Sequence, residues 1–599
     1  MADAKSLPPH LIGGNFLFTD GDPAVTFTPE ELSADEREMA ATAEKFMDKD
    51  VFPKLEALEH REEGLAVALF KKAGAELGLL GIEVPEQYGG LGLGKVAGVG
   101  IAEQLSRLAG FGITCGAHSG IGTGPIAHFG NEEQKQRYLP KLAGAEWMAA
   151  YCLSETGSGS DALGMKCKAV LSPDGKNYIL NGTKMWITNA AWADVFVVFA
   201  KVDGQHVTAF IVEKTFPGVS TGKEEHKLGL KTSSTRRLIL DNTPVPVANV
   251  LGEVGKGAYI AFNILNFGRF ALGAGCTGAA KDQLRLAVKY AGERQQFGRP
   301  IASFGLIQHK LGEMAARIYA AESAVYRTAD KIDQVKATGE MMDIIKPPFP
   351  RSLDEFALEC SIVKVACSEI LTFVADEALQ IHGGYGFTEE FQPARATRDA
   401  RINRIFEGTN EINRLFIPTN ILRRAQRGRL GLMAAAMAAL AEAQSAKDTD
   451  QAGDELAAAK SVLARAKKAA LLLFGAAHQK FGDKIIEEQE VLAVLSDLVI
   501  DIYLGESALL RALKARGKGA HDAIHADLAL TFVNDSVARM ENRARDALAA
   551  MAKGDELKLQ LGLARKMLRW TPLDTIAKRR RIARRLGEVG SYPALVAAR

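Results

Sequence analysis

Glu407 is the carboxylate whose neighbours in the sequence best suit proton transfer. It lies in the segment Arg404-Ile-Phe-Glu-Gly-Thr-Asn-Glu-Ile-Asn-Arg414, between Phe406 and Gly408. Partial burial beside apolar groups would raise the pKa of this carboxyl and make it a usable base near neutral pH. Glu411 follows a polar residue, so we expect a smaller perturbation there. Without further context, the alternative for Glu407 is an ordinary surface carboxylate.

Two further segments carry groups that would suit a planar cofactor. Tyr151-Cys-Leu-Ser-Glu-Thr-Gly-Ser-Gly-Ser-Asp161 leaves backbone N–H groups free to approach a ligand, although a plain Gly/Ser turn would have the same composition. In Met185-Trp-Ile-Thr-Asn189 an aromatic ring and a hydroxyl are two residues apart, so on a strand they face the same side. The simpler alternative there is a buried Trp beside an incidental Thr.

Two other segments would suit a nucleotide. Glu293-Arg-Gln-Gln-Phe-Gly-Arg-Pro300 places Arg294 after a helical run, where its guanidinium could bind a pyrophosphate, while Arg299 could be a solvated charge. The glycines of Gln380-Ile-His-Gly-Gly-Tyr-Gly-Phe387 permit close backbone contact with a nucleotide, or they end a helix. His382 by itself favours a structural role.

Composition and charge exclude several classes of protein. The 599 residues require several domains, and 74 basic against 72 acidic side chains leave a net charge of +2, which gives no whole-chain case for nucleic acid. Six widely spaced cysteines without ligand spacing indicate neither a metal site nor a disulfide framework, but free thiols. The first residues do not resemble a leader, which favours the cytoplasm. The charge-free run Leu108 to Asn131 contains seven glycines and a proline, so we expect no transmembrane helix.

The pattern along the chain predicts a mainly α protein with a central β-domain. After an N-terminal extension (1–34), helical spacing that starts from a cap at Ser33 predicts a helical domain over 35–148, and Thr28-Pro29 is another start signal. Over 149–256, β-branched runs at Val195, Val207 and Arg237 alternate with Asp-Gly, Asn-Gly and Pro-Gly turns, which predicts a β-domain.

Helical spacing returns in the last two regions. We expect a helix bundle over 257–425, interrupted by an exposed connection at Pro347–Pro350, and an additional helical domain over 426–599. Where the β-domain meets the bundles, a crevice for a cofactor is expected.

The five segments occur together and in order, and in this the chain resembles the acyl-CoA dehydrogenases from about residue 35 to 425. The phrases Asn249–Gly257, Asn263–Phe270 and Phe304–Gln308 are most similar to the very-long-chain branch, which also has an additional C-terminal helical domain. The resemblance implies an N-terminal helical bundle, a β-barrel-like middle domain and a four-helix bundle. It also implies FAD as cofactor, an acyl-CoA substrate, an electron-transfer flavoprotein as electron acceptor, and a homodimer.

Positions that match the family motifs imply roles for individual residues. Glu407 falls on the catalytic base, and the implied enolate donors are its own backbone N–H and an FAD ribityl hydroxyl. The implied substrate contacts are Ser160, Asn266, Arg269, Phe406 and Gly408. The implied FAD contacts are Tyr151, Leu153, Ser154, Gly159, Ser160, Trp186, Ile187, Thr188, Arg294, Phe297, Gln380, Gly383, Gly384, Thr409 and Glu411, with the Arg294 and Gln380–Gly384 contacts contributed across a dimer interface.

Some features depart from the family pattern or leave alternatives open. Thr156 stands where the family has proline, and a longer insertion occupies Lys336 to Asp354. The glycines at 120, 122 and 124 offer little bulk, which suits either a long acyl chain or close structural packing.

The C-terminal region carries local charge. Residues 551–599 hold twelve basic and four acidic side chains, densest at Lys578–Arg585, and Leu430–Leu440 follows four arginines. Peripheral contact with the inner face of a membrane is one reading, and packing inside the added domain is the other. A nucleic-acid-binding protein or an assembly factor on the same fold are the rival classes, but no groove-reading motif supports nucleic acid.

Overall fold

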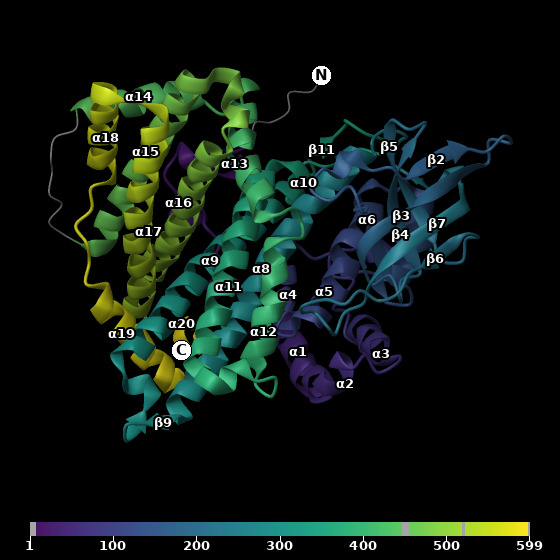
Figure 1. The fold of residues 1–599 in the computed structure, drawn as a ribbon, viewed down its shortest axis with the longest axis horizontal. Helices are drawn as coiled ribbons and strands as arrows, with labels where there is room; N and C mark the ends of the chain where they lie inside the picture. The colour runs from purple at the N-terminus through teal and green to yellow at the C-terminus, as the bar shows by residue number, and fades with distance from the viewer. Residues whose placement is uncertain (1–6, 446–453, 518–521, 597–599) are drawn as a thin grey trace.

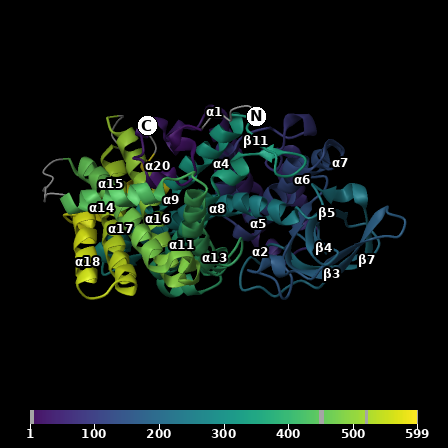
Figure 2. The ribbon, with the colours of Figure 1, turned by 90° about the horizontal axis from the view of Figure 1, so that it is seen from above.

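The computed structural model describes residues 7–445, 454–517 and 522–596. Three regions lie side by side along its longest axis, with a twisted sheet at one end, long helices in the middle and the C-terminal helices at the other end (Figure 1). The view from above places the sheet and the C-terminal helices on opposite sides of the central helices (Figure 2). The predicted mainly α class with a central sheet is confirmed.

The N-terminal helices begin where the sequence predicts a cap. Ser33 Oγ accepts the N–H of Glu36 at 3.2 Å, and the Glu36 carboxylate accepts the Ser33 N–H at 2.7 Å. A second capping box, at Thr28, starts the short 3-10 turn Pro29–Glu31. The helices are α1 (Ala34–Phe46), α2 (Leu55–Glu59), α3 (Leu65–Lys71), α4 (Lys95–Leu105), α5 (Ala109–Gly116), α6 (Gly124–Phe129) and α7 (Glu132–Ala143).

The charge-free run forms the short helices α5 and α6, joined by a π-helical turn over Ala117–Gly122. Among the residues described, no helix is long and apolar enough to cross a membrane.

The middle region is one sheet in the order β6-β7-β3-β2-β4-β5-β8, with β1 beside β4. β1 and β2 each pair with β4 in parallel, and the other neighbours are antiparallel. The strands are β1 (Ala149–Cys152), β2 (Lys168–Leu171), β3 (Asn177–Thr188), β4 (Val195–Val202), β5 (His206–Glu213), β6 (Val219–Thr221), β7 (Thr235–Pro246) and β8 (Val250–Leu251).

One predicted turn in this region is wrong. Asn181-Gly182 lies inside β3, where the register against β7 shifts between Leu180 and Gly182. Gly182 has φ +152°, and a Cβ there would lie 2.9 Å from Cys167 Sγ on the neighbouring segment. Gly182 is therefore required for a β-bulge and for the close approach of β3 to the segment that contains Cys167, and it does not form a hairpin turn.

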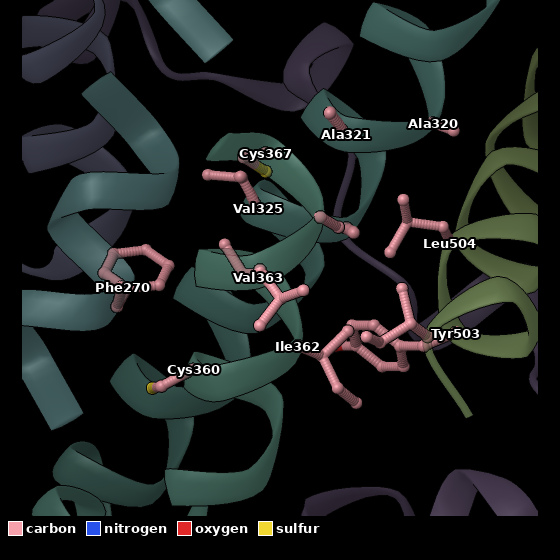
Figure 3. Packing of buried hydrophobic residues seen from close by; sticks show 14 of the residues in the cluster. Phe270, Ala320, Ala321, Val325, Cys360, Ile362, Val363, Cys367, Tyr503 and Leu504 are labelled. Carbon is pink, nitrogen blue, oxygen red and sulfur yellow. The ribbon is translucent and has the colours of Figure 1, made fainter. Parts of the chain in front are cut away.

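The central bundle is built on α8 and α11, which pack side by side. Figure 3 shows Phe270 of α8 facing Val363 of α11, and Ile362 of α11 facing Tyr503 of the C-terminal helices. All six cysteines are buried and unpaired, as expected. The elements are α8 (Gly257–Glu293), β9 (Gln295–Gln296), β10 (Arg299–Pro300), α9 (Gly305–Ala337), β11 (Met341–Met342), β12 (Phe349–Pro350), α10 (Ser352–Glu355), α11 (Ala357–His382), α12 (Gln392–Arg401) and α13 (Asn410–Gln426).

The connection around Pro347–Pro350 is not wholly exposed. β11 pairs with β12, and Phe349 is fully buried. Its ring lies 5.2 Å from that of Phe129 on α6 and 5.3 Å from that of Tyr259 on α8. The insertion is thus anchored onto the N-terminal and bundle regions by an apolar side chain between prolines.

The C-terminal helices pack on the outer side of the bundle. They are α14 (Leu432–Ser445), α15 (Glu455–Phe481), α16 (Gln489–Ala515), α17 (Asp522–Met551), α18 (Gly554–Leu568), α19 (Thr575–Val589) and α20 (Tyr592–Val596). Buried ion pairs fasten this contact: Arg327 of α9 bonds Glu506 of α16 at 2.8 Å. The N-terminal segment is tied in as well, because Arg511 of α16 bonds Glu30 at 2.6 Å.

The basic run at Lys578–Arg585 is internal at its start and exposed further on, at Arg580, Arg581 and Arg584. Lys578 and Arg579 are buried, with exposures of 6% and 5%. Lys578 bonds Glu455 at 2.6 Å, and Arg579 bonds Glu313 of α9. Part of the local charge excess is therefore neutralised within the fold, and the rest lies on the exposed face of α19.

Candidate active site

Glu407 lies in the short connection between the turn Ile402–Arg404 and α13. Its backbone is left-handed, with φ +58°, and that of Gly408 follows with φ +75°. Thr409 then caps α13, since its Oγ1 accepts the N–H of Ile412 at 3.2 Å. A left-handed glutamate is strained and persists only where the surroundings hold it.

Three buried side chains stabilise this left-handed backbone through hydrogen bonds to its carbonyl groups. Arg269 of α8 donates from Nε to the Glu407 carbonyl at 3.2 Å, and Lys364 of α11 donates to the Gly408 carbonyl at 2.7 Å. Asn413 donates to the same Gly408 carbonyl at 2.9 Å. Both cations are thus directed at carbonyl oxygens and not at the Glu407 carboxylate.

One oxygen of the Glu407 carboxylate is consequently buried without a partner, while the residue as a whole is half-buried. Oε2 is inaccessible and has no hydrogen bond to any described residue. Burial raises the pKa of Glu407 to about 7, and Arg269 and Lys364 offset only part of that rise. The perturbation expected from the sequence is therefore present, and its cause is desolvation. The pKa of Glu411, in contrast, is lowered.

Gly268 of α8 lies directly against this carboxylate. A Cβ built on Gly268 would be 2.6 Å from Oε2 and 3.0 Å from Oε1 of Glu407. Any other residue at 268 would displace the carboxylate, so the helix provides room for it with a glycine.

The carboxylate faces a cavity of about 200 Å³ between the N-terminal helices and α8. Most of its wall is apolar, with Leu80, Ile101, Ile113 and Leu272 as examples. Phe406 also lines it. An enclosed, largely apolar space beside a perturbed carboxylate fits an extended aliphatic ligand.

The glycines at 120, 122 and 124 differ in role: two line the cavity, and one allows close structural packing. Gly120 and Gly124 line the cavity, and a Cβ on Gly120 would meet nothing within 4 Å. At Gly122 a Cβ would lie 2.8 Å from the Ala149 Cβ, so this glycine serves close packing.

The two predicted flavin segments lie together at the carboxyl end of β3. The Met185 N–H donates to the Ser154 carbonyl at 2.8 Å, which joins the Tyr151–Asp161 loop to the end of β3. Beneath them the fully buried Lys184 donates to the Leu153 carbonyl at 3.0 Å and to Glu155 at 2.8 Å.

The expected strand geometry at Trp186 is interrupted. The register against β7 shifts between Lys184 and Ile187, and Trp186 has φ +62°. Ile187 is buried, whereas the Trp186 side chain is 56% exposed. The indole is therefore available to a ligand.

These segments fit a flavin. Backbone at Gly157 and Gly159 is open, with nothing within 4 Å of an added Cβ. Tyr151 lies close enough to Glu407 that the carboxylate contributes to the raised pKa of the phenol. An exposed ring and an open glycine loop are thus the groups that could hold a flavin, and Ser160 is exposed on the same loop.

The predicted nucleotide contacts lie elsewhere in the chain. Arg294, Gly383 and Gly384 line a separate surface pocket, Gln380 is exposed near it, and Phe297 is 91% exposed. Gly268 and Arg294 mark the two ends of a stretch of α8 that spans about 39 Å at 1.5 Å per residue. One chain cannot bring both groups to the same end of one cofactor.

Asn266 and Arg269 do not line the cavity. Asn266 accepts from Arg269 Nη1 at 3.2 Å, and both lie behind the Glu407 connection. Their neighbours Phe267 and Gly268 form the wall instead.

Sequence reasoning missed Gly268, Lys364 and Asn413. For Lys364 a signal existed, because it is a single charge inside the apolar run Ser361–Cys367. Nothing in the sequence marked Gly268 as the neighbour of a residue 139 positions away.

Comparisons with known proteins identify the family to which the chain is similar. Family models for the acyl-CoA dehydrogenase N-terminal domain, middle domain and C-terminal domain match residues 33–146, 150–243 and 255–422, and a further C-terminal-domain model matches 465–566. A probable acyl-CoA dehydrogenase of Bacillus subtilis is 47% identical, covering 97% of this chain and 98% of that protein. The human mitochondrial very long-chain specific acyl-CoA dehydrogenase is 35% identical over 92% of this chain and 85% of its own. The crystal structure of an acyl-CoA dehydrogenase complexed with FAD from Bacillus anthracis superposes with a TM-score of 0.94, at 47% identity, covering 97% of this chain and 99% of that one.

Proposed function

The chain belongs to the acyl-CoA dehydrogenases, FAD-dependent oxidoreductases, and we propose that Glu407 is the base that removes the α-proton of its acyl thioester substrate. The observation that carries this proposal is the buried carboxylate without a partner, raised to a pKa of about 7 and facing an apolar cavity. A base with a pKa near the working pH combines a deprotonated fraction with useful basicity.

The α-proton of a saturated thioester is weakly acidic, so its removal requires stabilisation of the developing enolate oxygen. We propose the Glu407 backbone N–H as one donor. Arg269, Lys364 and Asn413 hold the carbonyls of this connection and so fix the direction of that N–H. The cavity excludes water around the reacting carbons, which strengthens each of these interactions.

FAD, when bound, supplies the acceptor for the hydride that leaves the β-carbon, and the product is a trans-2-enoyl thioester. In this proposal the Tyr151–Ser160 loop, with Leu153, Ser154 and Gly159, lies along the flavin. Trp186, Ile187 and Thr188 lie behind it, and Thr409 and Glu411 add contacts from the start of α13.

We further propose a homodimer that completes the cofactor site. The separation along α8 supports this, because Arg294, Phe297, Gln380, Gly383 and Gly384 can only reach a cofactor beside the Glu407 of a second copy. The acceptor of electrons is proposed to be an electron-transfer flavoprotein, as the family resemblance implies.

For the substrate we propose a long-chain acyl-CoA. The open backbone at Gly120 and the wall formed by Leu80, Ile101 and Leu272 support a long aliphatic tail.

Peripheral membrane contact is proposed through α14. Met433, Met437 and Leu440 on this helix are 47%, 64% and 39% exposed, whereas Ala436, Ala439 and Ala443 face the other C-terminal helices. One apolar face is thus packed and the other is open, which is the pattern of an interfacial helix.

Anaerobic mixing of the purified yellow protein with acyl-CoAs of graded length tests the reaction and the chain length together. We expect bleaching of the flavin absorbance, fastest with long chains. Absence of bleaching with every chain length would contradict the proposal.

A further inference from the structure

One part of the acyl cavity is polar. Glu83, Lys95 and His128 line it together, and we call them the polar wall group. Lys95 is the first residue of α4, Glu83 lies in the loop before it, and His128 is near the end of α6. They come from three segments, and Lys95 and His128 both lie against the ring of Phe267, the residue before Gly268.

Glu83 presents its carboxylate to the cavity. Its neighbours Ile82 and Val84 are buried, at 7% and 4%, yet the Glu83 side chain is 40% accessible. Gly98, which has no side chain, leaves space for the Glu83 carboxylate, because a Cβ at Gly98 would be 3.6 Å from Glu83 Oε1. Oε2 bonds the Lys95 ammonium, while Oε1 has no hydrogen bond to any described side chain or backbone group.

Lys95 neutralises Glu83 without using all of its donors. Its ammonium lies 3.8 Å from the centre of the Phe267 ring and bonds one carboxylate oxygen. Only one of its three N–H donors is used in a hydrogen bond to a described residue.

His128 contributes an uncharged donor and acceptor. Its ring packs edge-on against Phe267 at 5.8 Å, and neither ring nitrogen has a hydrogen-bond partner within the described ranges. Burial, reinforced by the nearby Lys95, lowers its pKa to about 3, so the imidazole is neutral with one N–H and one free nitrogen.

The group is neutral overall and has unused donors and acceptors. Unpaired polar groups in an apolar cavity disfavour a plain alkyl chain and favour a guest that can both donate and accept. A hydroxyl does both. A carboxylate would meet the like charge of Glu83.

We propose that the polar wall group is a subsite for a hydroxyl carried on the acyl chain. The chain would then oxidise hydroxylated acyl-CoAs alongside unsubstituted ones. This inference rests on the proposed function, because it assigns an acyl chain to the cavity.

The test uses CoA thioesters of one chain length, unsubstituted or with a single hydroxyl at successive positions. The ratio of kcat/KM for each hydroxylated thioester to that for the unsubstituted one is measured by flavin reduction in the holoenzyme. We expect one position with a ratio near or above unity, and neighbouring positions at least about tenfold lower.

Variants then test whether the polar wall group causes the high ratio at the favoured position. In His128→Phe, and in Glu83→Gln combined with Lys95→Met, the ratio at the favoured position should fall about tenfold. Leu272→Met, a volume-conserving change in the apolar wall, is the matched control and should leave the ratio unchanged.

A flat positional profile in the wild type, or a ratio unaffected by both variants, overturns the proposal. So does an equal loss for all thioesters, which would place the group against the CoA portion. If no thioester bleaches the flavin, the proposed function fails, and calorimetric binding of the same series decides the subsite separately.

Discussion

Glu407 and Glu506 are two enclosed carboxylates in neighbouring parts of one helical assembly, and their electrostatics are opposite. The pKa of Glu407 is raised to about 7, whereas that of Glu506 is lowered to about 2. Desolvation raises the pKa in both cases, so burial does not explain the difference.

The partners explain it. Glu506 accepts from Arg327 at 2.8 Å, from Lys467 and from the Gly21 N–H at 3.0 Å. Near Glu407 the two cations bind backbone carbonyls, and the carboxylate oxygen faces Gly268 and the cavity. The molecule thus uses buried charge for cohesion at one place and for reactivity at the other.

The largest expected effect comes from Glu407→Gln, which keeps the shape of the side chain but removes the base. Flavin reduction by acyl-CoA should slow by about 10²- to 10⁴-fold, because a positioned general base contributes that much. Stopped-flow absorbance measures it. Glu44→Gln, the same change at an exposed position of α1, is the control, and full-speed bleaching in Glu407→Gln would refute the assignment.

Next in size is the loss of cohesion in Arg327→Met. Glu506 would keep Lys467 but lose its guanidinium partner, and stability should fall by about 3 kcal/mol. Thermal unfolding followed by circular dichroism measures this as a lower Tm. Adding Glu506→Gln to the variant should restore part of the loss, and an unchanged Tm in the single variant would show that the pair is dispensable.

Gly268→Ala should lower kcat by about tenfold, because the new methyl group requires the Glu407 carboxylate to move from its position. FAD content and Tm should stay close to wild type. Gly120→Ala, in open space on the cavity wall, is the matched substitution. Equal kcat values for Gly268→Ala and wild type would mean that the carboxylate can relocate freely.

The smallest effects are those of pH. With a pKa of about 7, Glu407 should make kcat/KM rise with pH up to about 7 and then level off. A profile flat from pH 5 to 8 would contradict the raised pKa.

Glu407 and Glu506 make the stability of the fold depend on pH in opposite directions. The raised pKa of Glu407 stabilises the fold fully below its ordinary value of 4.5, and this contribution is lost as pH rises through about 7. The lowered pKa of Glu506 stabilises above 4.5, and that contribution is lost as pH falls towards 2. Comparing Tm against pH for Glu407→Gln and Glu506→Gln should separate the two slopes.

Local chemistry explains what could be predicted from the sequence. Ser33 and Glu36 form their cap within four residues, and Val195 and Val207 mark strands by composition alone. The raised pKa of Glu407 followed from its apolar neighbours Phe406 and Gly408. Each of these signals lies next to the residue it describes.

What could not be predicted depends on residues far apart in the chain. Gly182 serves a bulge because Cys167 lies across from it, and Arg579 is internal because Glu313 receives it. Gly268 contacts Glu407 for the same kind of reason. The residue type alone is ambiguous at such positions, because a glycine or an arginine that packs inside the fold cannot be distinguished in the sequence from one on the surface.

The bond between Glu30 and Arg511 has a consequence for how the chain is assembled. It joins residues 481 positions apart, and the same guanidinium also bonds Glu322 of the bundle. During synthesis the first residues must wait until α16 has left the ribosome before this contact can close. Contacts of such high sequence separation carry the loop-closure cost late in folding. We therefore expect the N-terminal segment around Glu30 to dock late in folding, after most of the chain has been synthesised.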